Sequence, residues 1–252
     1  MIKINEKNYY SKTNNKKYMS YSQFKDFCKC PAMAMAKIKG KWEQEETESL
    51  LVGSYVDNWL DGNLDKFVVQ HPEMFTMKGE LKAPFKKAEE ICNIIEQDEY
   101  LYKILKGERQ KILTGNIAGV PFKIKMDSLT EDMIVDGKVL KDCEDVWLDG
   151  KKQPFYMVNR YDIQAVIYKT IYKQNYGKDL PFILGVVTKE KVPDKRLIKI
   201  NDNILEDAKN EIITKAPIFQ AMKDGTEEIW SCGCCDYCKS VKKLSKNDIE
   251  EV

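Results

Sequence analysis

Residues 120–140 read VPFKIKMDSLTEDMIVDGKVL. Val120–Ser128 and Met133–Leu140 are rich in apolar and β-branched residues, and a short break at 129–132 separates them. Two runs of this composition on either side of a short break predict two strands joined as a hairpin. We therefore expect antiparallel strands near the middle of the chain.

Three charged side chains in this stretch point to metal chemistry. Asp136 and Lys138 are two residues apart, so in a strand they lie on the same face. Pairing of the two strands would bring Asp127, near the end of the first strand, beside them. Two carboxylates and a lysine on one sheet face suit a hard divalent cation that binds oxygen ligands and activates a water molecule.

Three further segments carry recognisable spacings. Ser20–Pro31 reads SYSQFKDFCKCP and opens with a capping-box pattern, which predicts a helix that stops before the proline. Gly53 and Asp57 are four residues apart in a predicted helix and therefore share one of its faces. Gln164 and Tyr168 have the same spacing in another predicted helix, so they too lie along one side of it.

In chain order, these segments resemble the motif series of the PD-(D/E)XK nuclease superfamily, in its RecB and phage RecE-type exonuclease-like branch. That branch carries an SxSxxxxxxxCP segment, a Gly-x-x-x-His/Asp helix, a D…(D/E)xK core and a Q-x-x-x-Y helix. The matching segments here are Ser20–Pro31, Gly53–Asp57, Asp127 to Lys138, and Gln164–Tyr168. The resemblance implies an α/β (α+β) fold, with a restriction-endonuclease-like core whose central mixed sheet is flanked by helices.

The resemblance also implies a role for each matching residue. The implied ligands of one or two Mg²⁺ (or Mn²⁺) ions are Asp57, Asp127 and Asp136. The implied catalytic residues are Asp127, Asp136, Lys138, Gln164 and Tyr168. The lysine would orient or deprotonate the attacking water, and the glutamine and tyrosine would steady the lysine and the DNA strand.

Two positions depart from the family pattern. Gly137 stands where an apolar strand residue is usual, and a glycine loosens the interior of a strand. Asp57 stands where a histidine is commoner. Neither change removes a charge that the site needs, so we expect activity to be retained.

These residues predict a metal-dependent DNA nuclease, namely a phage-type exodeoxyribonuclease that acts on DNA ends in recombination or repair. The expected partners are DNA and a single-strand annealing or recombination protein. The alternative is a catalytically inactive DNA-binding or assembly module on the same fold. A small-molecule enzyme that uses the same acids is a third class, which no pocket motif in the sequence supports. The choice between exonuclease and endonuclease, the cleavage polarity and the oligomeric state stay open.

Four of the eight cysteines fall within WSCGCCDYC near the end of the chain. Cys232, Cys235 and Cys238 follow a C-x2-C-x2-C spacing close to ferredoxin-like ligand runs, and Cys30 could supply a fourth thiolate. Some nucleases of the superfamily are similar, with one cysteine before the core and three after it around a [4Fe–4S] cluster. Zinc is the main rival, because four-cysteine zinc sites also use C-x2-C knuckles. Unliganded thiols are the third interpretation.

Composition sets the outer limits of these hypotheses. The 252 residues are 43% hydrophobic with a net charge of +1, which suits one large domain. We expect a single domain over residues 1–252, with a helical region over about 1–105 and a cysteine-rich knuckle over about 228–240. Residues 1–42 hold ten lysines against Glu6 and Asp26. This basic segment could meet phosphates or could simply be a solvated surface.

Missing motifs exclude other classes of protein. His71 is the only histidine, so HExxH zinc chemistry is impossible and a Ser-His-Asp hydrolase would depend on that one residue. There is no GxxxxGK[ST] loop and no GxGxxG. No apolar run approaches the roughly 20 residues of a membrane span, and the N-terminus lacks a secretory pattern. We therefore expect a soluble, cytoplasmic protein without membrane contact.

The segments between the motifs give weaker expectations. Pro84–Leu105 has apolar residues at helical spacing, which predicts one long amphipathic helix whose stripe belongs to the core. Residues 1–17 predict an irregular arm, and 63–82 and 143–153 predict loops.

Overall fold

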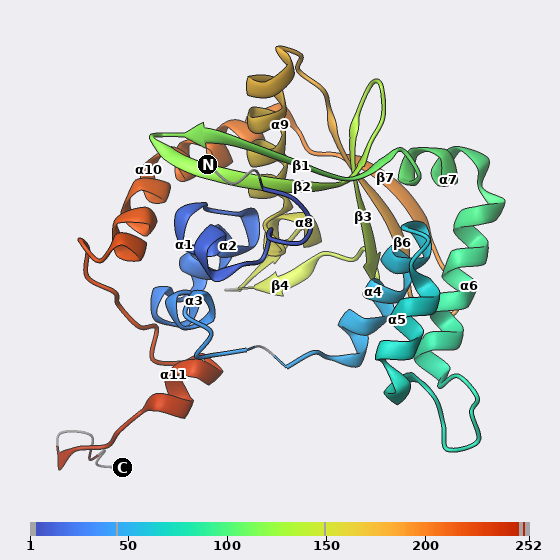
Figure 1. Ribbon diagram of the computed structural model, residues 1–252, viewed down its shortest axis with the longest axis horizontal. Coiled ribbons are helices and arrows are strands. Elements are labelled where there is room, and N and C mark those ends of the chain that lie inside the picture. Colours follow the sequence, from blue (N-terminus) through green and yellow to red (C-terminus); the bar gives the residue numbers. More distant parts are fainter. Residues whose placement is uncertain (1–3, 44, 149, 247–248, 250–252) are drawn as a thin grey trace. The chain divides into compact units, whose positions relative to one another are not determined.

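The computed structural model describes residues 4–43, 45–148, 150–246 and 249 (Figure 1). Its helices are α1 (Lys12–Lys17), α2 (Tyr21–Lys29), α3 (Pro31–Ile38), α4 (Glu48–Leu60), α5 (Leu64–Gln70), α6 (Ala83–Gln97), α7 (Glu99–Leu105), α8 (Phe155–Val158), α9 (Tyr161–Tyr176), α10 (Asp202–Asp224) and α11 (Asp236–Val241), with a 3-10 turn at Pro72–Met74. Its strands are β1 (Glu108–Ile117), β2 (Val120–Leu129), β3 (Ile134–Leu140), β4 (Val146–Leu148), β5 (Lys151–Gln153), β6 (Phe182–Thr188) and β7 (Lys195–Lys199).

The chain forms two compact units, each built from separate stretches of sequence. The sheet unit comprises Glu45–Gly115 and Ile124–Lys209. The cysteine unit comprises Met1–Gln44, Asn116–Lys123 and Asn210–Val252. Within the described ranges, no helix has the length and apolar character needed to cross a membrane.

The main sheet has five strands in the order β1-β2-β3-β6-β7. β3 and β6 are parallel, from Ile134 opposite Phe182 to Leu140 opposite Thr188. β2 pairs with β3, and β6 with β7, in antiparallel fashion. This is the central mixed sheet that the sequence predicts, and the hairpin of β2 and β3 is confirmed.

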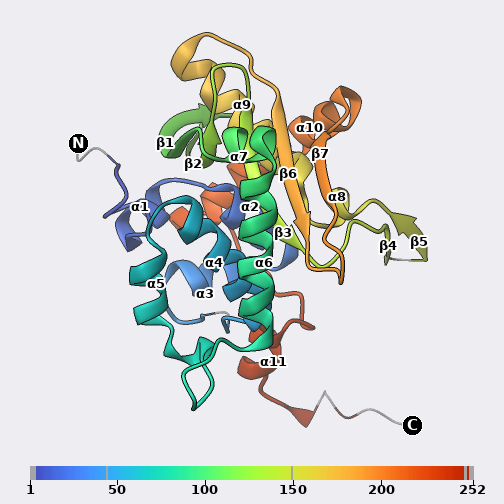
Figure 2. The same cartoon turned by 90° about the vertical axis from the view of Figure 1, so that its right-hand side faces the viewer.

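The two faces of β3 and β6 are covered differently. Val135 and Val187 point to one face, where they join the buried core formed by α4, α6 and α7. On the other face lies α9, whose Tyr168 ring contacts the Phe182 ring edge-on with centroids 5.8 Å apart. Figure 1 shows β3 between α9 and the group of α4 and α6, and Figure 2 shows α4 and α6 side by side. Asp136 and Lys138 belong to the α9 face, because they alternate with Val135 along the strand.

Four local expectations were wrong. The helix expected over 84–105 is divided at Asp98, whose carboxylate accepts a hydrogen bond from the Leu101 amide and so starts α7. The loop expected over 63–82 contains α5 and a 3-10 turn, and the loop expected over 143–153 contains the short hairpin of β4 and β5. The arm expected over 1–17 contains α1, which Ser11 caps.

Aromatic packing holds the cysteine unit together. Phe24 and Phe27 of α2 are fully buried, and both rings lie about 5 Å from the ring of Phe219 in α10. α2 starts at the predicted position, with Ser20 accepting a hydrogen bond from the Gln23 amide. The helix ends at Cys30, and Pro31 then begins α3. The first helix of the motif series therefore delivers Cys30 to the interior of this unit.

Candidate active site and cysteine cluster

The predicted acids meet where β2 and β3 separate beyond their paired residues. We call this place the fork. These strands pair only through Ser128 with Val135 and Leu129 with Ile134. Beyond these pairs Asp127 Oδ2 accepts a hydrogen bond from the backbone amide of Gly137 at 3.2 Å. A carboxylate thus takes the place of a ladder bond, which fixes Asp127 against the strand that carries Asp136.

Asp136 and Lys138 form an ion pair on the face of β3 that α9 covers. The Asp136 side chain is only 2% exposed, whereas that of Lys138 is 22% exposed. Gln164 of α9 donates its side-chain amide to Asp136 Oδ1 at 2.6 Å. The buried acid is therefore held from two sides, and the lysine keeps access to solvent.

Burial dominates the electrostatics of this pair. It raises the pKa of Asp136 to about 7, with Lys138 opposing the shift and Asp127 adding to it. Burial alone would lower the pKa of Lys138, but the nearby Asp136 and Asp127 carboxylates outweigh it and raise that pKa above its ordinary value. Lys138 is therefore a firmly held cation.

Asp57 comes to the fork from helix α4. Burial and the charge of Asp127 raise its pKa, while Lys138 and Arg109 lower it, so all three charges lie close to the carboxylate. Its side chain is still 46% exposed. The carboxylate is thus near the other acids and also open to a ligand from solvent.

The structure brings Asp57, Asp127, Asp136 and Lys138 into one neighbourhood, as the motif series predicts. The oxygen atoms of the three carboxylates do not converge as closely as metal ligands do. Among the described residues, only the cysteine cluster has three or more ligand atoms all within 4.8 Å of one another. The Lys138 ammonium group contacts Asp136 Oδ2.

Gln164 and Tyr168 both form hydrogen bonds within the site, but neither bonds Lys138. Gln164 bonds Asp136 rather than Lys138, and its side-chain Oε1 is buried without a hydrogen-bond partner in the described part of the chain. The Tyr168 hydroxyl donates to the Lys125 carbonyl at 3.0 Å, two residues before Asp127 on β2. The tyrosine is only 8% exposed, so it supports the strand from inside.

Two residues beside the site, Tyr161 and Arg109, belong to none of the sequence motifs. The Lys138 ammonium group lies 5.5 Å from the centre of the Tyr161 ring, at the start of α9. Arg109 lies between Asp57 and Asp61, and its guanidinium bonds the latter at 2.6 Å. Tyr161 stands three residues before Gln164, so the helical period could have suggested it. Arg109 is 52 residues from Asp57, and no local spacing relates the two.

The donor set at the fork fits a divalent metal. Carboxylate oxygens are the ligands that Mg²⁺ and Mn²⁺ prefer, and Asp57, Asp127 and Asp136 supply them. The unpartnered Gln164 Oε1 is a buried acceptor, and such atoms are generally satisfied by water or an ion. A metal with its bound water would meet that need.

The cysteine cluster consists of Cys30, Cys232, Cys235 and Cys238, whose four Sγ atoms all lie within 4.8 Å of one another. Cys30 Sγ is 3.6 Å from Cys238 Sγ, and Cys232 Sγ is 3.9 Å from Cys238 Sγ. All four are free thiols. The chain thus brings Cys30 from the end of α2 to the C-terminal knuckle.

The surroundings of the cluster act on its thiols in opposite directions, and burial raises the pKa of Cys238 to about 12. Backbone amides of Cys234 and Cys235 lower the pKa of Cys232 to about 6, since both donate to its sulfur. Cys30 and Cys238 are buried, and Trp42 packs against the cluster. Four converging sulfurs, one of them stabilised as a thiolate, fit a bound metal.

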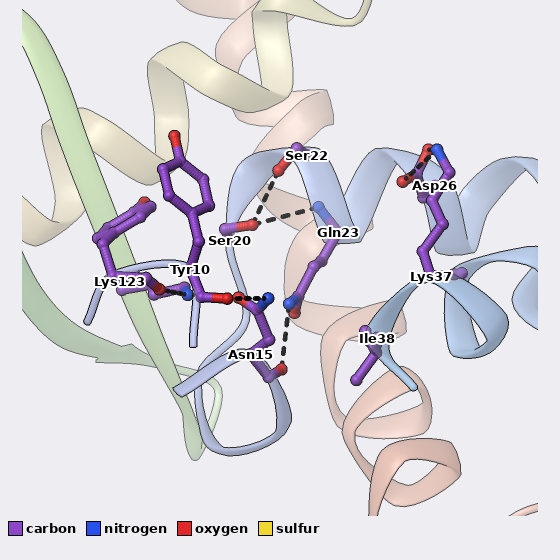
Figure 3. A pocket seen from close by; sticks show the side chains of 11 residues that line it. Tyr10, Asn15, Ser20, Ser22, Gln23, Asp26, Lys37, Ile38 and Lys123 are labelled. Carbon is purple, nitrogen blue, oxygen red and sulfur yellow. Dashed lines mark hydrogen bonds and ion pairs between the residues drawn. The ribbon is translucent and has the colours of Figure 1, made fainter. Parts of the chain in front are cut away.

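The Ser20–Pro31 segment also lines a small pocket in the cysteine unit, with a volume of about 120 Å³. Figure 3 shows Ser20 between Ser22 and Gln23, with Lys123 on the neighbouring strand. Lys123 is itself buried and donates to the Tyr9 carbonyl and to Asn15 Oδ1. The start of the segment therefore lines the pocket, and its end supplies Cys30 to the cysteine cluster.

Comparison with known proteins identifies the family. Residues 20–241 match the family model described as "PDDEXK-like domain of unknown function (DUF3799)", and the chain belongs to that family. A crystal structure of a protein from Eubacterium rectale, described as a "putative exonuclease", is 42% identical and superposes with a TM-score of 0.93. The alignment covers 98% of this chain and 96% of that one. A search of curated proteins finds no match. The predicted membership of the PD-(D/E)XK superfamily is confirmed.

Proposed function

We propose that this protein is a divalent-metal-dependent DNA nuclease that degrades DNA from its ends. The observation that carries the proposal is the fork between β2 and β3, where Asp127, Asp136 and Lys138 converge. A solvated carboxylate, Asp57, lies beside them. Membership of a PDDEXK-like family and the relative described as an exonuclease support the same chemistry.

In this proposal Asp57, Asp127 and Asp136 hold Mg²⁺ or Mn²⁺, which when bound acidifies a water molecule and stabilises charge on the phosphate. Lys138 orients the attacking water and offsets the negative charge that develops on the phosphoryl oxygens. Gln164 keeps Asp136 in place, and Tyr168 steadies β2. Hydrolysis adds the water oxygen to phosphorus and breaks one P–O ester bond.

The substrate we propose is a DNA end, resected in recombination or repair in the cytoplasm. The lysine-rich segment over residues 1–42 would contribute phosphate contacts. Resection leaves a single strand, so a strand-annealing protein is the partner that this chemistry would serve.

Substitution of the central residues tests the catalytic assignment. We expect Lys138→Ala and Asp136→Asn to lower Mg²⁺-dependent degradation of duplex DNA by at least about 100-fold, because the first removes a positive charge at the reacting phosphate and the second removes the charge of a metal ligand. DNA affinity should change little, since binding rests on phosphate contacts elsewhere. Absence of metal-dependent cleavage by the unmodified protein would favour the inactive binding module instead.

Substrate form tests the preference for ends. We expect linear duplex DNA to be degraded to short products while a relaxed covalently closed circle of the same sequence survives. Equal digestion of both forms would make the protein an endonuclease and would leave the metal chemistry intact.

At the cysteine cluster we propose a structural metal, and the separations of the sulfurs favour zinc over a [4Fe–4S] cluster. A tetrahedral ion with Zn–S bonds of about 2.3 Å holds its sulfurs about 3.8 Å apart, close to the 3.6 and 3.9 Å found here. In an iron–sulfur cluster each thiolate binds a different iron, which needs wider spacing. Elemental analysis of anaerobically prepared protein should find one zinc per chain; a brown protein with about four irons would reverse the choice.

A further inference from the structure

Arg109 is fixed in an unusual way beside the fork. Its Nε donates to Asp61 Oδ1 at 2.6 Å, and its Nη1 donates to the Leu105 carbonyl at 3.1 Å. The Arg109 side chain is 13% exposed and that of Asp61 is 17% exposed. The guanidinium is therefore anchored from the end of α4 and the end of α7, which leaves little freedom to its plane.

The next residue strengthens this anchor through a strained backbone. Gln110 has a φ of 55°, in the left-handed region that residues other than glycine rarely adopt. Adjacent side chains of a regular strand point to opposite faces, yet Gln110 donates to Asp61 Oδ2 at 3.0 Å while Arg109 bonds Oδ1 of the same carboxylate. Such strain persists where the surrounding contacts impose it, and it gathers at functional sites.

The free edge of the guanidinium faces Asp57. Arg109 Nη2 lies 3.8 Å from Asp57 Oδ1 and 3.5 Å from the Asp57 carbonyl oxygen. Nη2 thus donates to the Asp57 carbonyl, while the carboxylate lies beyond hydrogen-bond distance and its lone pairs stay available. Asp61, four residues later at the end of α4, accepts from Arg109 through Oδ1 and from Gln110 through Oδ2.

We propose that Arg109, held by Asp61, is the positioning residue that orients Asp57 as a metal ligand. The inference rests on the proposed function. Carboxylate ligands are generally held by partners behind them, and loss of such a partner costs about 10–100-fold in metal affinity or activity. Arg109, fixed by Asp61 and by the Leu105 carbonyl, is placed to be that partner for Asp57.

The test is a thermodynamic cycle on Mn²⁺ affinity, measured by calorimetry with the full-length chain. Arg109→Met should weaken Mn²⁺ binding about tenfold when Asp57 is present. In the Asp57→Ala background the same change should alter affinity less than twofold, because the ligand it orients is gone. Lys111→Met is the matched control: this cation lies two residues along β1 and pairs with Glu108, so its removal should leave the isotherm unchanged.

Arg109→Lys keeps the charge but not the planar fork, and it should recover only part of the affinity. Should Arg109→Met fail to fold, Asp61→Asn tests the same anchor and should weaken Mn²⁺ binding in the same direction. Unchanged or tighter binding by a folded Arg109→Met or Asp61→Asn variant would overturn the inference while the nuclease proposal stands. Failure of the unmodified protein to bind Mn²⁺ would overturn the proposed function itself.

Discussion

At the scale of single residues, burial decides which charges are fixed. Asp136 is almost completely buried and is held by Lys138 and Gln164, whereas Asp57 is half-exposed and its Oδ1 lies 3.8 Å from Arg109 Nη2. The two-residue period of a strand was enough to predict that Asp136 and Lys138 lie on the same face. The contact of Arg109 with Asp57 could not be predicted, because it joins a helix and a strand 52 residues apart.

Lys223, a buried lysine outside the candidate active site, predicts an unusual pH dependence of the free energy of unfolding. Lys223 is 4% exposed and donates to the Tyr18 carbonyl and to Gln23 Oε1. Burial, with Lys123 nearby, lowers its pKa to about 7. The unfolded chain, in which lysine has a pKa of about 10.4, then binds more protons than the folded chain between about pH 7 and 10. The free energy of unfolding should therefore rise with pH in this window, by at most about 1.4 kcal/mol per pH unit for this group.

Comparison of the unmodified protein with Lys223→Met isolates that contribution. Chemical unfolding at pH 7 and pH 9 should show a smaller rise in the free energy of unfolding for the variant. Equal pH slopes for the two proteins would mean that Lys223 keeps its proton in the folded state.

At the scale of elements, glycine explains how α7 reaches the sheet. Gly137 and Gly185 are opposite each other in β3 and β6. A Cβ on Gly185 would lie 3.2 Å from Leu105 Cδ2, while one on Gly137 would lie 3.4 Å from the same atom. The departure of Gly137 from the family pattern therefore belongs to a pair of glycines beneath Leu105.

This packing gives a prediction about stability. Gly185→Val should lower the free energy of unfolding by about 1–3 kcal/mol, because the added methyl groups overpack the contact with Leu105. Leu105→Ala should cancel part of that loss in the double variant. Gly137→Ala is the milder control, since its Cβ finds ordinary contact distance. Additive losses in the double variant would show that Leu105 is not the obstacle.

Element boundaries were predictable where residue type and period agreed. The β2–β3 hairpin, the start of α2 after Ser20 and a helix that carries Gln164 and Tyr168 are all found where the sequence predicts them. The division of α6 from α7 was missed, because the apolar stripe continues past Asp98 and hides a side chain that caps the second helix.

At the scale of the whole molecule, the order of the motifs predicted the family while the cysteines required the three-dimensional structure. Cys30 and Cys238 are 208 residues apart, yet their sulfurs are 3.6 Å apart. The spacing of the C-terminal cysteines indicated a metal site. The convergence of all four sulfurs within 4.8 Å shows that Cys30 is in reach of it.

A metal at this cluster should stabilise the fold that carries it. Cys238→Ser should abolish the bound metal and lower the melting temperature, because metal-binding free energy contributes to folding. Cys234→Ser is the matched control, since Cys234 is exposed and lies outside the four-sulfur cluster. Retention of one metal per chain by the Cys238→Ser variant would contradict this assignment.

The central claim is that the acids at the fork between β2 and β3 hold a catalytic divalent metal. Anomalous diffraction from crystals soaked in Mn²⁺ tests it most directly. We expect an anomalous peak bounded by carboxylate oxygens of Asp57, Asp127 and Asp136, at the 2.0–2.3 Å or so typical of such bonds, and its loss in Asp127→Asn crystals. A fully soaked crystal with no peak at the fork would contradict the account.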